Sequence, residues 1–289
     1  MTSREIINLW PTAAPGSEDW THDEIEFTAP FADQPDRQWQ GLRNVRTPSM
    51  TVYRPAAPNG SAVLVCPGGG YRILAYDYEG IDIAEWFAAR GVTAFLLKYR
   101  VEPTPPDSEE FARDSAALVA TIITDFEALI STLDVGRKRA VADGVQAMKL
   151  IRQRAAEFGV DPARVGVIGF SAGAGVTVGV ALSEPATRPN WAAPIYGGDR
   201  GDASVPADAP PLFIVVSQDD PFRLAPECIH LYQRWIDGGA KADLHVYSEG
   251  GHGYGMRQLG LTTDHWPALL DDWLRKLGVL AKDSPAHGG

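Results

Sequence analysis

The sequence predicts an α/β fold with a mostly parallel central sheet and helices on both faces. Short, continuous apolar runs, such as residues 61–67 (SAVLVCP) and 164–170 (RVGVIGF), are typical of strands buried on both faces. These runs alternate with segments of helical periodicity, such as residues 80–91 and 226–239, as expected when helices connect parallel strands. The chain has 289 residues, 45% of them hydrophobic, which is enough for one large domain with a sizeable core.

The expected elements can be assigned in chain order. Residues 49–55 alternate between apolar and polar types, as a strand does. In the segment 80–91 the apolar residues follow helical spacing, and Gly91 is suited to end the helix. Strands are expected at 49–55, 61–67, 92–100, 164–170, 192–197, 211–217 and 242–248. Helices are expected at 80–91, 144–159, 172–183, 226–239 and 264–278.

The two ends of the chain lack this alternation. Residues 1–48 are rich in Pro, Asp and Trp and show little periodicity, so we expect an irregular N-terminal arm with room for one edge strand. We expect residues 281–289 to form a flexible tail. Because no internal repeat and no linker divides the remainder, residues 49–280 are expected to form a single α/β domain.

A long segment at about residues 103–139 interrupts the alternation and predicts an inserted helix. Asp107 and Glu110 form a capping-box pattern at its start, and Gly136 is suited to end it. One helical stripe carries Phe111, Ser115, Leu118, Ile122, Phe126, Leu129 and Leu133. The segment leaves the carboxyl end of a strand, the side on which open α/β sheets bind ligands. A lid, a packing scaffold and a subunit contact are all compatible with this pattern.

The sequence GFSAG at residues 169–173 lies where a buried strand is expected to meet a helix. A serine hydroxyl at such a sharp turn projects from the top of the sheet, and small flanking residues allow the neighbouring backbone to approach. Gly169 and Gly173 meet that requirement around Ser171. The context therefore favours a catalytic nucleophile at Ser171 over a plain turn serine.

A serine nucleophile needs a base and a group that orients the base. Of the six histidines, His252 lies in a glycine-rich loop (EGGHGYG) just after an expected strand, where it can reach the upper edge of the sheet. Asp219 and Asp220 follow another strand, and either carboxylate can orient the imidazole. We favour Asp220, because a proline follows it and begins the turn.

Backbone N–H groups are needed to stabilise the oxyanion that forms at the ester carbonyl. We expect one from Ala172, directly after the serine, and others from Gly69 and Gly70 in the loop PGGGY. A phosphate-binding loop is disfavoured, because no lysine follows the glycines and the G-x-G-x-x-G spacing is absent.

Composition and charge limit the partners that we expect. The formal net charge is −11 and no run of five basic residues occurs, which argues against nucleic-acid binding. No stretch of 18 uncharged apolar residues predicts a membrane span, and the N-terminus does not resemble a secretory signal, so we expect a cytoplasmic protein. Cys66 and Cys228 form no C-x-x-C or zinc pattern, which favours a reducing compartment.

Five motifs in order, VLVCPGGGY, FLLKYRV, FGVDPARVGVIGFSAGA, DDPF and GGHGYG, resemble α/β-hydrolase esterases of the acetyl-xylan-esterase and feruloyl-esterase-like group. The resemblance covers about residues 50–278. It implies an α/β-hydrolase fold, a carbohydrate acetylesterase-like activity on small acyl esters, and no metal or other cofactor. It assigns the nucleophile, acid, base and oxyanion donors to the matching positions Ser171, Asp220, His252, Gly69, Gly70 and Ala172. Ala174, where a glycine is common, and the long segment at 103–139 depart from the pattern.

The sequence thus predicts a serine carboxylesterase that acts on a small-molecule ester, such as an acetyl ester of a xylan-derived or other sugar. A peptidase or amidase on the same fold and a non-catalytic ligand-binding protein are the alternatives, and a homo-oligomer is compatible with either. Aromatic residues that could stack on a sugar ring lie near the expected site loops: Tyr71, Tyr76, Trp191, Tyr196, Phe222 and Tyr254. Of these we assign substrate binding to Tyr71 and Tyr254.

Overall fold

An eight-stranded sheet runs through the molecule in the computed structural model, which describes residues 4–124, 126–199 and 201–281, without the side chains at 119 and 122–132. Its strands, in spatial order, are β1 (Ile6–Asn8), β4 (Ser49–Tyr53), β7 (Thr93–Lys98), β5 (Ala62–Cys66), β8 (Val165–Phe170), β9 (Ala192–Ile195), β10 (Leu212–Ser217) and β11 (Ala242–Tyr247). Strand β4 pairs antiparallel with both of its neighbours, and the other pairings are parallel. The predicted, mostly parallel sheet is confirmed.

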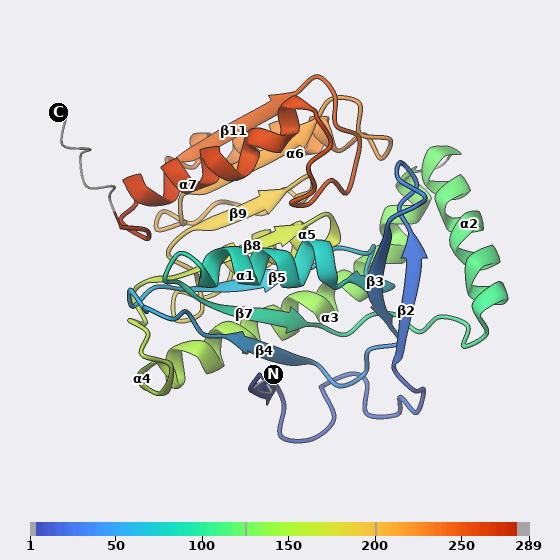
Figure 1. Ribbon diagram of the computed structural model, residues 1–289, viewed down its shortest axis with the longest axis horizontal. Helices are drawn as coiled ribbons and strands as arrows, with labels where there is room; N and C mark the ends of the chain where they lie inside the picture. The colour runs from blue at the N-terminus through green and yellow to red at the C-terminus, as the bar shows by residue number, and fades with distance from the viewer. Residues whose placement is uncertain (1–3, 125, 200, 282–289) are drawn as a thin grey trace.

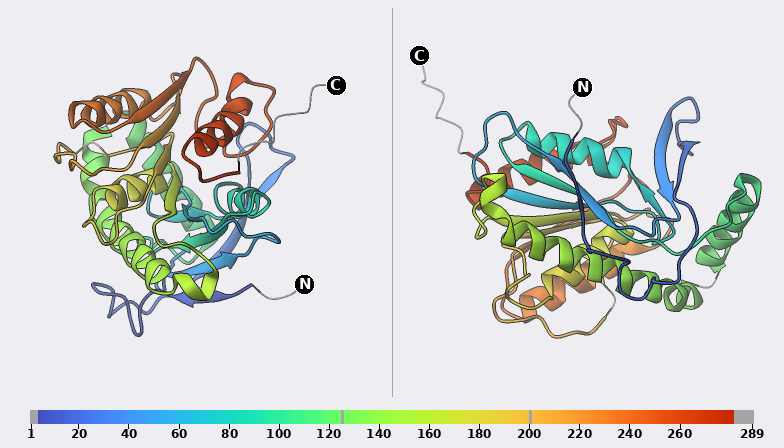
Figure 2. Two further views of the ribbon diagram at one scale, coloured as in Figure 1. Left: turned by 90° about the vertical axis from the view of Figure 1, so that its left-hand side faces the viewer. Right: turned by 90° about the horizontal axis from the view of Figure 1, so that it is seen from below.

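Helices cover both faces of this sheet, as predicted (Figure 2). Helices α1 (Asp82–Ala88) and α7 (Trp266–Lys276) pack on one face. Helices α3 (Phe126–Gln153), α5 (Ala172–Ala181) and α6 (Leu224–Asp237) cover the other, and the short α4 (Ala155–Phe158) follows α3. The central strands β5, β8 and β10 are buried along their whole length, because they lie between these two helical layers.

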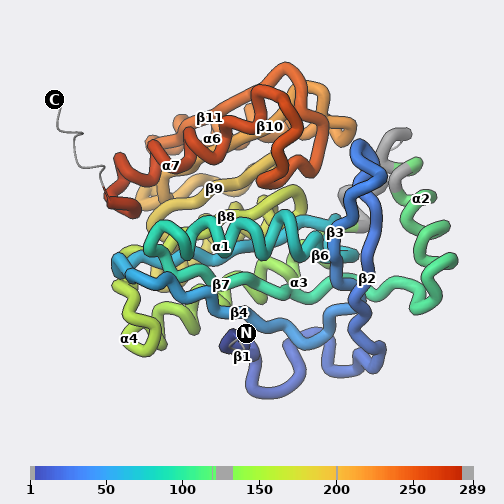
Figure 3. Tube along the Cα trace, viewed as in Figure 1, coloured from blue at the N-terminus to red at the C-terminus, as the bar shows by residue number. Residues whose placement is uncertain are grey.

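The path of the chain creates a switch point in the middle of the sheet (Figure 3). From β5 the chain passes through α1 to β7 on one side, whereas β8 and the strands after it extend the sheet on the other side. The loops that follow β5 and β8 therefore leave neighbouring strands in opposite directions. Such a position forms the usual ligand-binding crevice of an open α/β sheet.

The N-terminal arm differs from the irregular segment that we expected. It contributes β1 to the large sheet, and β2 (Ile25–Pro30) and β3 (Gln38–Arg43) to a second sheet completed by β6 (Ile73–Ala75). These strands are short and no residue of β2 is fully buried, so their sequences lack the apolar runs that mark the central strands. The second sheet stands at the end toward which the parallel strands point (Figure 1).

The inserted segment forms α2 (Ser108–Thr124) beside the second sheet, and α3 follows (Figure 1). The Asp107 carboxylate accepts the N–H of Glu110 at 2.9 Å, as the capping pattern predicts. Phe111 anchors α2, because its ring lies 5.8 Å from the ring of Phe27 and beneath the guanidinium of Arg43. The side chains of Ile122, Phe126 and Leu129 from the predicted stripe lie outside the described part of the structure.

The predicted helix end at Gly136 is wrong, because α3 continues through this residue to Gln153. Gly136 is required instead for close packing: a Cβ there would lie 2.9 Å from the Cβ of Tyr71. The glycine thus allows α3 to pass against the loop after β5. The expected helix at 144–159 is the C-terminal part of α3 together with α4, and it ends at Gly159 in a left-handed conformation, as predicted.

A buried ion pair connects the arm and α3 to the segment that follows β7. The guanidinium of Arg100 donates two hydrogen bonds of 2.9 Å to the carboxylate of Asp143, and both side chains are at most 1% exposed. Arg100 also donates to the carbonyl of Pro15, and the indole of Trp10 donates to Asp143 at 2.9 Å. Because the charged groups of this pair are hydrogen-bonded, the pair can hold α3 in place against the sheet.

Within the described residues, every helix is too short or too polar to cross a bilayer. The two cysteines are free and buried, Cys66 on β5 and Cys228 on α6. Burial raises the pKa of both thiols well above the ordinary value, so they remain protonated at neutral pH. A turn of π-helix, η1 (Asp77–Ile81), precedes α1, and a 3-10 turn, η2 (Thr262–His265), precedes α7.

Candidate active site

Ser171 lies at the turn between β8 and α5, beside the switch point of the sheet. Its φ of 51° and ψ of −118° are strained for a residue with a side chain. The flanking glycines are sterically required: a Cβ at Gly169 would lie 2.2 Å from the carbonyl oxygen of Gly173, and one at Gly173 would lie 2.0 Å from that of Cys66. The turn therefore holds the serine side chain up from the sheet, as expected for this motif.

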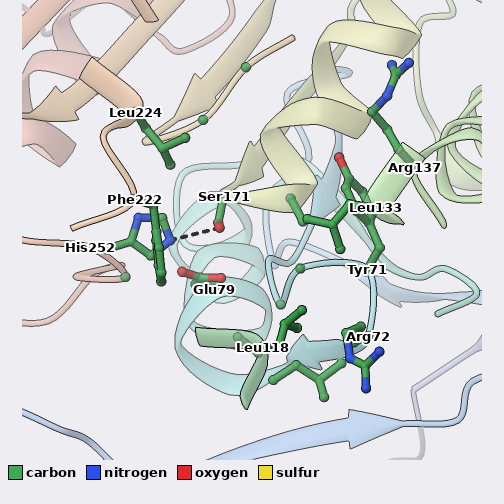
Figure 4. A pocket seen from close by; sticks show the side chains of 18 of the residues that line it. Tyr71, Arg72, Glu79, Leu118, Leu133, Arg137, Ser171, Phe222, Leu224 and His252 are labelled. Carbon is green, nitrogen blue, oxygen red and sulfur yellow. Dashed lines mark hydrogen bonds between the residues drawn. The ribbon is translucent and has the colours of Figure 1, made fainter. Parts of the chain in front are cut away.

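The structure brings Ser171, His252 and Asp220 together in one hydrogen-bonded row. The Nε2 atom of His252 lies 2.9 Å from Oγ of Ser171 (Figure 4), and Nδ1 lies 2.7 Å from Oδ2 of Asp220. When Nδ1–H donates to the carboxylate, Nε2 has a free lone pair and can accept the serine proton. Of the described histidines, His252 is the one that lines the cavity at Ser171.

The two neighbouring aspartates have different surroundings. The side chain of Asp220 is fully buried, and its Oδ1 accepts the N–H of Phe222 at 2.8 Å while Oδ2 faces the imidazole. Asp219 instead accepts the N–H groups of Gly250 and Gly251, at 3.2 and 2.8 Å, and so holds the loop that carries the histidine. The geometry therefore pairs Asp220, and not Asp219, with the imidazole of His252.

The expected oxyanion donors surround the same space. Gly69, Gly70 and Ala172 line the cavity together with Ser171. Gly69 and Gly70 have φ values of 127° and 60°, which side chains rarely allow, and a Cβ at Gly69 would lie 2.2 Å from the carbonyl oxygen of Ile73. The loop thus has no space for a side chain at position 69, and Gly70 fits its left-handed backbone without strain beside Ser171.

A cavity of about 620 Å³ opens at Ser171, large enough for a small ligand. One wall comes from the inserted segment, through Leu118 of α2 and Leu133 of α3 (Figure 4). Phe222 stands on the opposite side, with its ring 4.6 Å from the imidazole of His252. The large apolar and aromatic residues of the wall are Trp39, Tyr71, Ile73, Tyr78, Phe111, Leu118, Leu133, Phe222 and Leu224.

Charged groups gather at the end of the cavity near α3. The guanidinium of Arg137 lies 3.0 Å from the carboxylate of Asp134 and 3.6 Å from that of Asp199. Hydrogen bonds from Lys138 and Arg137 hold the pKa of Asp134 below its ordinary value. This end can therefore hold the polar part of a ligand, whereas the wall formed by α2 can hold an apolar part.

The two tyrosines expected to bind substrate have different positions. Tyr71 lines the cavity, and its positive φ of 58° follows directly after the glycine loop. The assignment of Tyr254 is not supported by its position: the residue is 1% exposed and is missing from the described residues that line the cavity. Its ring packs at 4.5 Å against that of Tyr196, because the chain after Gly253 turns back into the core.

Glu79 is a residue of the cavity wall that our sequence analysis missed. It lies on η1, is 2% exposed, and accepts hydrogen bonds from the N–H of Gly68 at 2.9 Å and the hydroxyl of Tyr196 at 2.7 Å. Burial raises the pKa of its carboxyl, an effect opposed by the Tyr196 hydrogen bond and by the nearby His252. An irregular π turn at this position is itself typical of functional sites, but no sequence period reveals it.

Comparison with known proteins shows that this chain is similar to hydrolases. A model of the dienelactone hydrolase family matches residues 50–282. An acetylxylan esterase of Xylanibacter ruminicola is 25% identical over 272 residues, which are 82% of this chain and 48% of that protein. The chain therefore spans about half the length of the curated relative that it matches.

Two solved structures are similar over most of the chain. An acetyl ester-xyloside bifunctional hydrolase from Caldicellulosiruptor lactoaceticus has a TM-score of 0.64 and 20% identity, and the match covers 96% of this chain and 97% of that one. MGS-M1, an α/β hydrolase enzyme from a deep-sea metagenome library of the Medee basin, has a TM-score of 0.61 and 21% identity, with coverages of 80% and 92%. At these identities the likeness shows the fold, and it confirms the predicted α/β-hydrolase class.

Proposed function

The chain belongs to the dienelactone hydrolase family, and on that premise we propose that it is a serine carboxylesterase with Ser171 as its nucleophile. The observation that carries this proposal is the continuous hydrogen-bonded row from Asp220 through His252 to Ser171, which ends at a cavity. A row of this kind supplies the activated hydroxyl that acyl transfer needs. The strained turn at Ser171 and the nearby glycine loop supply the remaining parts of such a site.

In the first half of the proposed reaction, Oγ of Ser171 attacks the ester carbonyl carbon while Nε2 of His252 takes the hydroxyl proton. The carboxylate of Asp220 stabilises the imidazolium that forms. Backbone N–H groups of Gly69, Gly70 and Ala172 donate to the carbonyl oxygen as it becomes negative. When the tetrahedral intermediate collapses, His252 gives its proton to the departing alcohol, and the acyl group stays on Ser171.

Water completes the cycle with the same groups in the same roles. His252 accepts a proton from a water molecule as the water oxygen attacks the acyl carbonyl carbon. The second intermediate collapses to the carboxylic acid, and the proton returns from Nε2 to Oγ of Ser171. In both halves of the reaction the proton therefore moves between Ser171, His252 and the substrate or water, along the 2.9 and 2.7 Å contacts.

We further propose acetyl esters of sugars as the substrate class. The support is that the relative from Xylanibacter ruminicola is an acetylxylan esterase and that the similar structure from Caldicellulosiruptor lactoaceticus is an acetyl ester-xyloside hydrolase. The charged end of the cavity at Arg137, Asp134 and Asp199 offers donors and acceptors for sugar hydroxyl groups.

Acetate release measures this substrate proposal directly. We expect the protein to release acetate from acetylated xylo-oligosaccharides and from p-nitrophenyl acetate, and to leave the matching p-nitroanilide intact, because an amide carbonyl is more strongly resonance-stabilised than an ester. Comparable turnover of the anilide would instead favour an amidase. Tight binding of the acetylated sugar without acetate release would favour a ligand-binding protein.

We propose that α2 forms a substrate-contacting wall rather than a scaffold alone, and Leu118→Asp tests this. The substitution places a charge against the apolar part of an aryl ester, so we expect KM for p-nitrophenyl butyrate to rise about 10-fold with little change in kcat, as for the loss of about one buried apolar contact. Ala116→Asp is the matched control, because Ala116 is exposed on the same helix. Equal kinetic parameters for both variants would show that α2 does not touch the substrate.

A further inference from the structure

Glu79 is a buried acid that the proposed reaction does not use, although Figure 4 shows its carboxylate beside the Ser171–His252 pair. Resting on the proposed esterase function, we propose that Glu79 is a positioning residue: one carboxylate oxygen fixes the oxyanion loop, and the other fixes the loop of the catalytic base. The two loops belong to distant parts of the sequence, and Glu79 is bonded to both, directly or through one hydroxyl.

One carboxylate oxygen of Glu79 holds the glycine loop. Oε2 of Glu79 accepts the N–H of Gly68 at 2.9 Å. Gly68 itself is enclosed, because a Cβ there would lie 2.4 Å from Oε2 of Glu79 and 2.9 Å from the Cβ of Ser171. The backbone of the loop is thus clamped between the carboxylate and the serine, directly before the expected donors Gly69 and Gly70.

The other carboxylate oxygen of Glu79 holds the histidine loop through Tyr196. The hydroxyl of Tyr196 donates to Oε1 of Glu79 at 2.7 Å and accepts the N–H of Gly255 at 3.0 Å. The ring of Tyr196 also packs edge-on against the imidazole of His252, with 5.1 Å between the ring centroids. Tyr196 follows β9 with a positive φ of 36°, a strained conformation that aims its side chain at this junction.

A carboxylate suits this junction better than any other side chain. Both of its partners donate: the N–H of Gly68 cannot accept, and the hydroxyl of Tyr196 already accepts from Gly255. A carboxylate accepts from both, whereas the amide of a glutamine presents an N–H to one of them. Desolvation makes a buried acid costly, as the raised pKa of Glu79 reflects, so a merely space-filling role is served better by an apolar residue.

The test compares Glu79→Gln, Tyr196→Phe and the double variant on p-nitrophenyl acetate, with Tm measured for each. A displacement of about 1 Å at the reacting groups costs on the order of 100-fold in rate, so we expect Glu79→Gln to lower kcat about 10- to 100-fold with KM within about 2-fold. Tyr196→Phe keeps the bond to Gly68, and its loss of kcat should be smaller. Because both residues serve one network, the double variant should lose less than the product of the single losses.

Matched controls separate positioning from general effects. Glu85→Gln makes the same chemical change on α1, where Glu85 pairs with Arg4 at the surface, and we expect wild-type kinetics. Tyr53→Phe removes a buried tyrosine hydroxyl on β4, outside the residues that line the cavity, and kcat should again be unchanged.

The outcomes distinguish this inference from the proposed function. If Ser171→Ala abolishes turnover while Glu79→Gln keeps the kcat of the wild type, the positioning role is overturned and the esterase remains. A fall in Tm for Glu79→Gln with normal kcat in the folded protein would show a purely structural role. If Ser171→Ala retains activity, the proposed function itself fails, whatever the Glu79 variants do.

Discussion

Replacing Ser171 with alanine should lower kcat for p-nitrophenyl acetate by a factor of about 10⁴ or more. The variant removes the oxygen that attacks the carbonyl and forms the acyl-enzyme, and His252 then has no hydroxyl to deprotonate. The fold should be unaffected, because the strained turn carries a smaller side chain without any loss of buried packing. Residual turnover would come from water attacking an ester that is still bound near the backbone donors.

A serine at the far end of the same helix provides the control for this experiment. Ser183 follows α5, its hydroxyl is hydrogen-bonded to that of Thr187 at 2.9 Å, and it is outside the described residues that line the cavity, so Ser183→Ala should keep the wild-type kcat. A fluorophosphonate probe should label the wild-type protein and Ser183→Ala, and it should leave Ser171→Ala unlabelled. Labelling of Ser171→Ala, or its retention of turnover, would contradict the assignment of the nucleophile.

The hydrogen-bonded row of Ser171, His252 and Asp220 was predictable from the sequence because each member follows a strand that is marked by a local pattern. Ser171 comes directly after β8, and Asp220 and His252 lie in the loops that follow β10 and β11. The carboxyl ends of parallel strands meet at one edge of a sheet. The same logic placed Gly69 and Gly70 after β5, next to β8. Local periodicity and one rule of sheet topology are therefore sufficient to predict that these residues lie close together.

The features that sequence reasoning missed depend on contacts between distant segments. Nothing in the local pattern around Glu79 shows that its carboxylate will be enclosed by Gly68 and Tyr196. A glycine can end a helix or allow close packing, and the sequence alone does not distinguish the two. Gly136 has the second role, because its lack of a side chain allows α3 to pack on Tyr71. Two strands of the arm, β2 and β3, belong to a sheet that is completed by β6, a distant strand of only three residues, so local periodicity in the arm does not reveal this sheet.

Replacing Asp220 with asparagine should lower kcat by about 10³- to 10⁴-fold, and the same change at the neighbouring Asp219 should have a much smaller effect. The amide cannot balance the charge of the imidazolium, and its NH₂ group favours the tautomer whose Nε2 carries the proton and cannot accept one from Ser171. Burial increases this loss in kcat, because the Asp220 side chain is fully enclosed and solvent does not stabilise the imidazolium in place of the missing carboxylate. Binding should change little, so KM should stay within about 3-fold, as for an interaction made mainly in the transition state.

Asp219→Asn is the matched control, because it makes the same chemical change one residue earlier. Its carboxylate accepts two backbone N–H groups, from Gly250 and Gly251, and an asparagine oxygen can still accept one of them. The loop that carries His252 should loosen slightly, with a loss in kcat of less than about 10-fold. The decisive quantity is the ratio of the two kcat values: if Asp219→Asn is as inactive as Asp220→Asn, the acid has been misassigned, because a residue that only ties down a loop cannot match the loss of the charge that faces Nδ1.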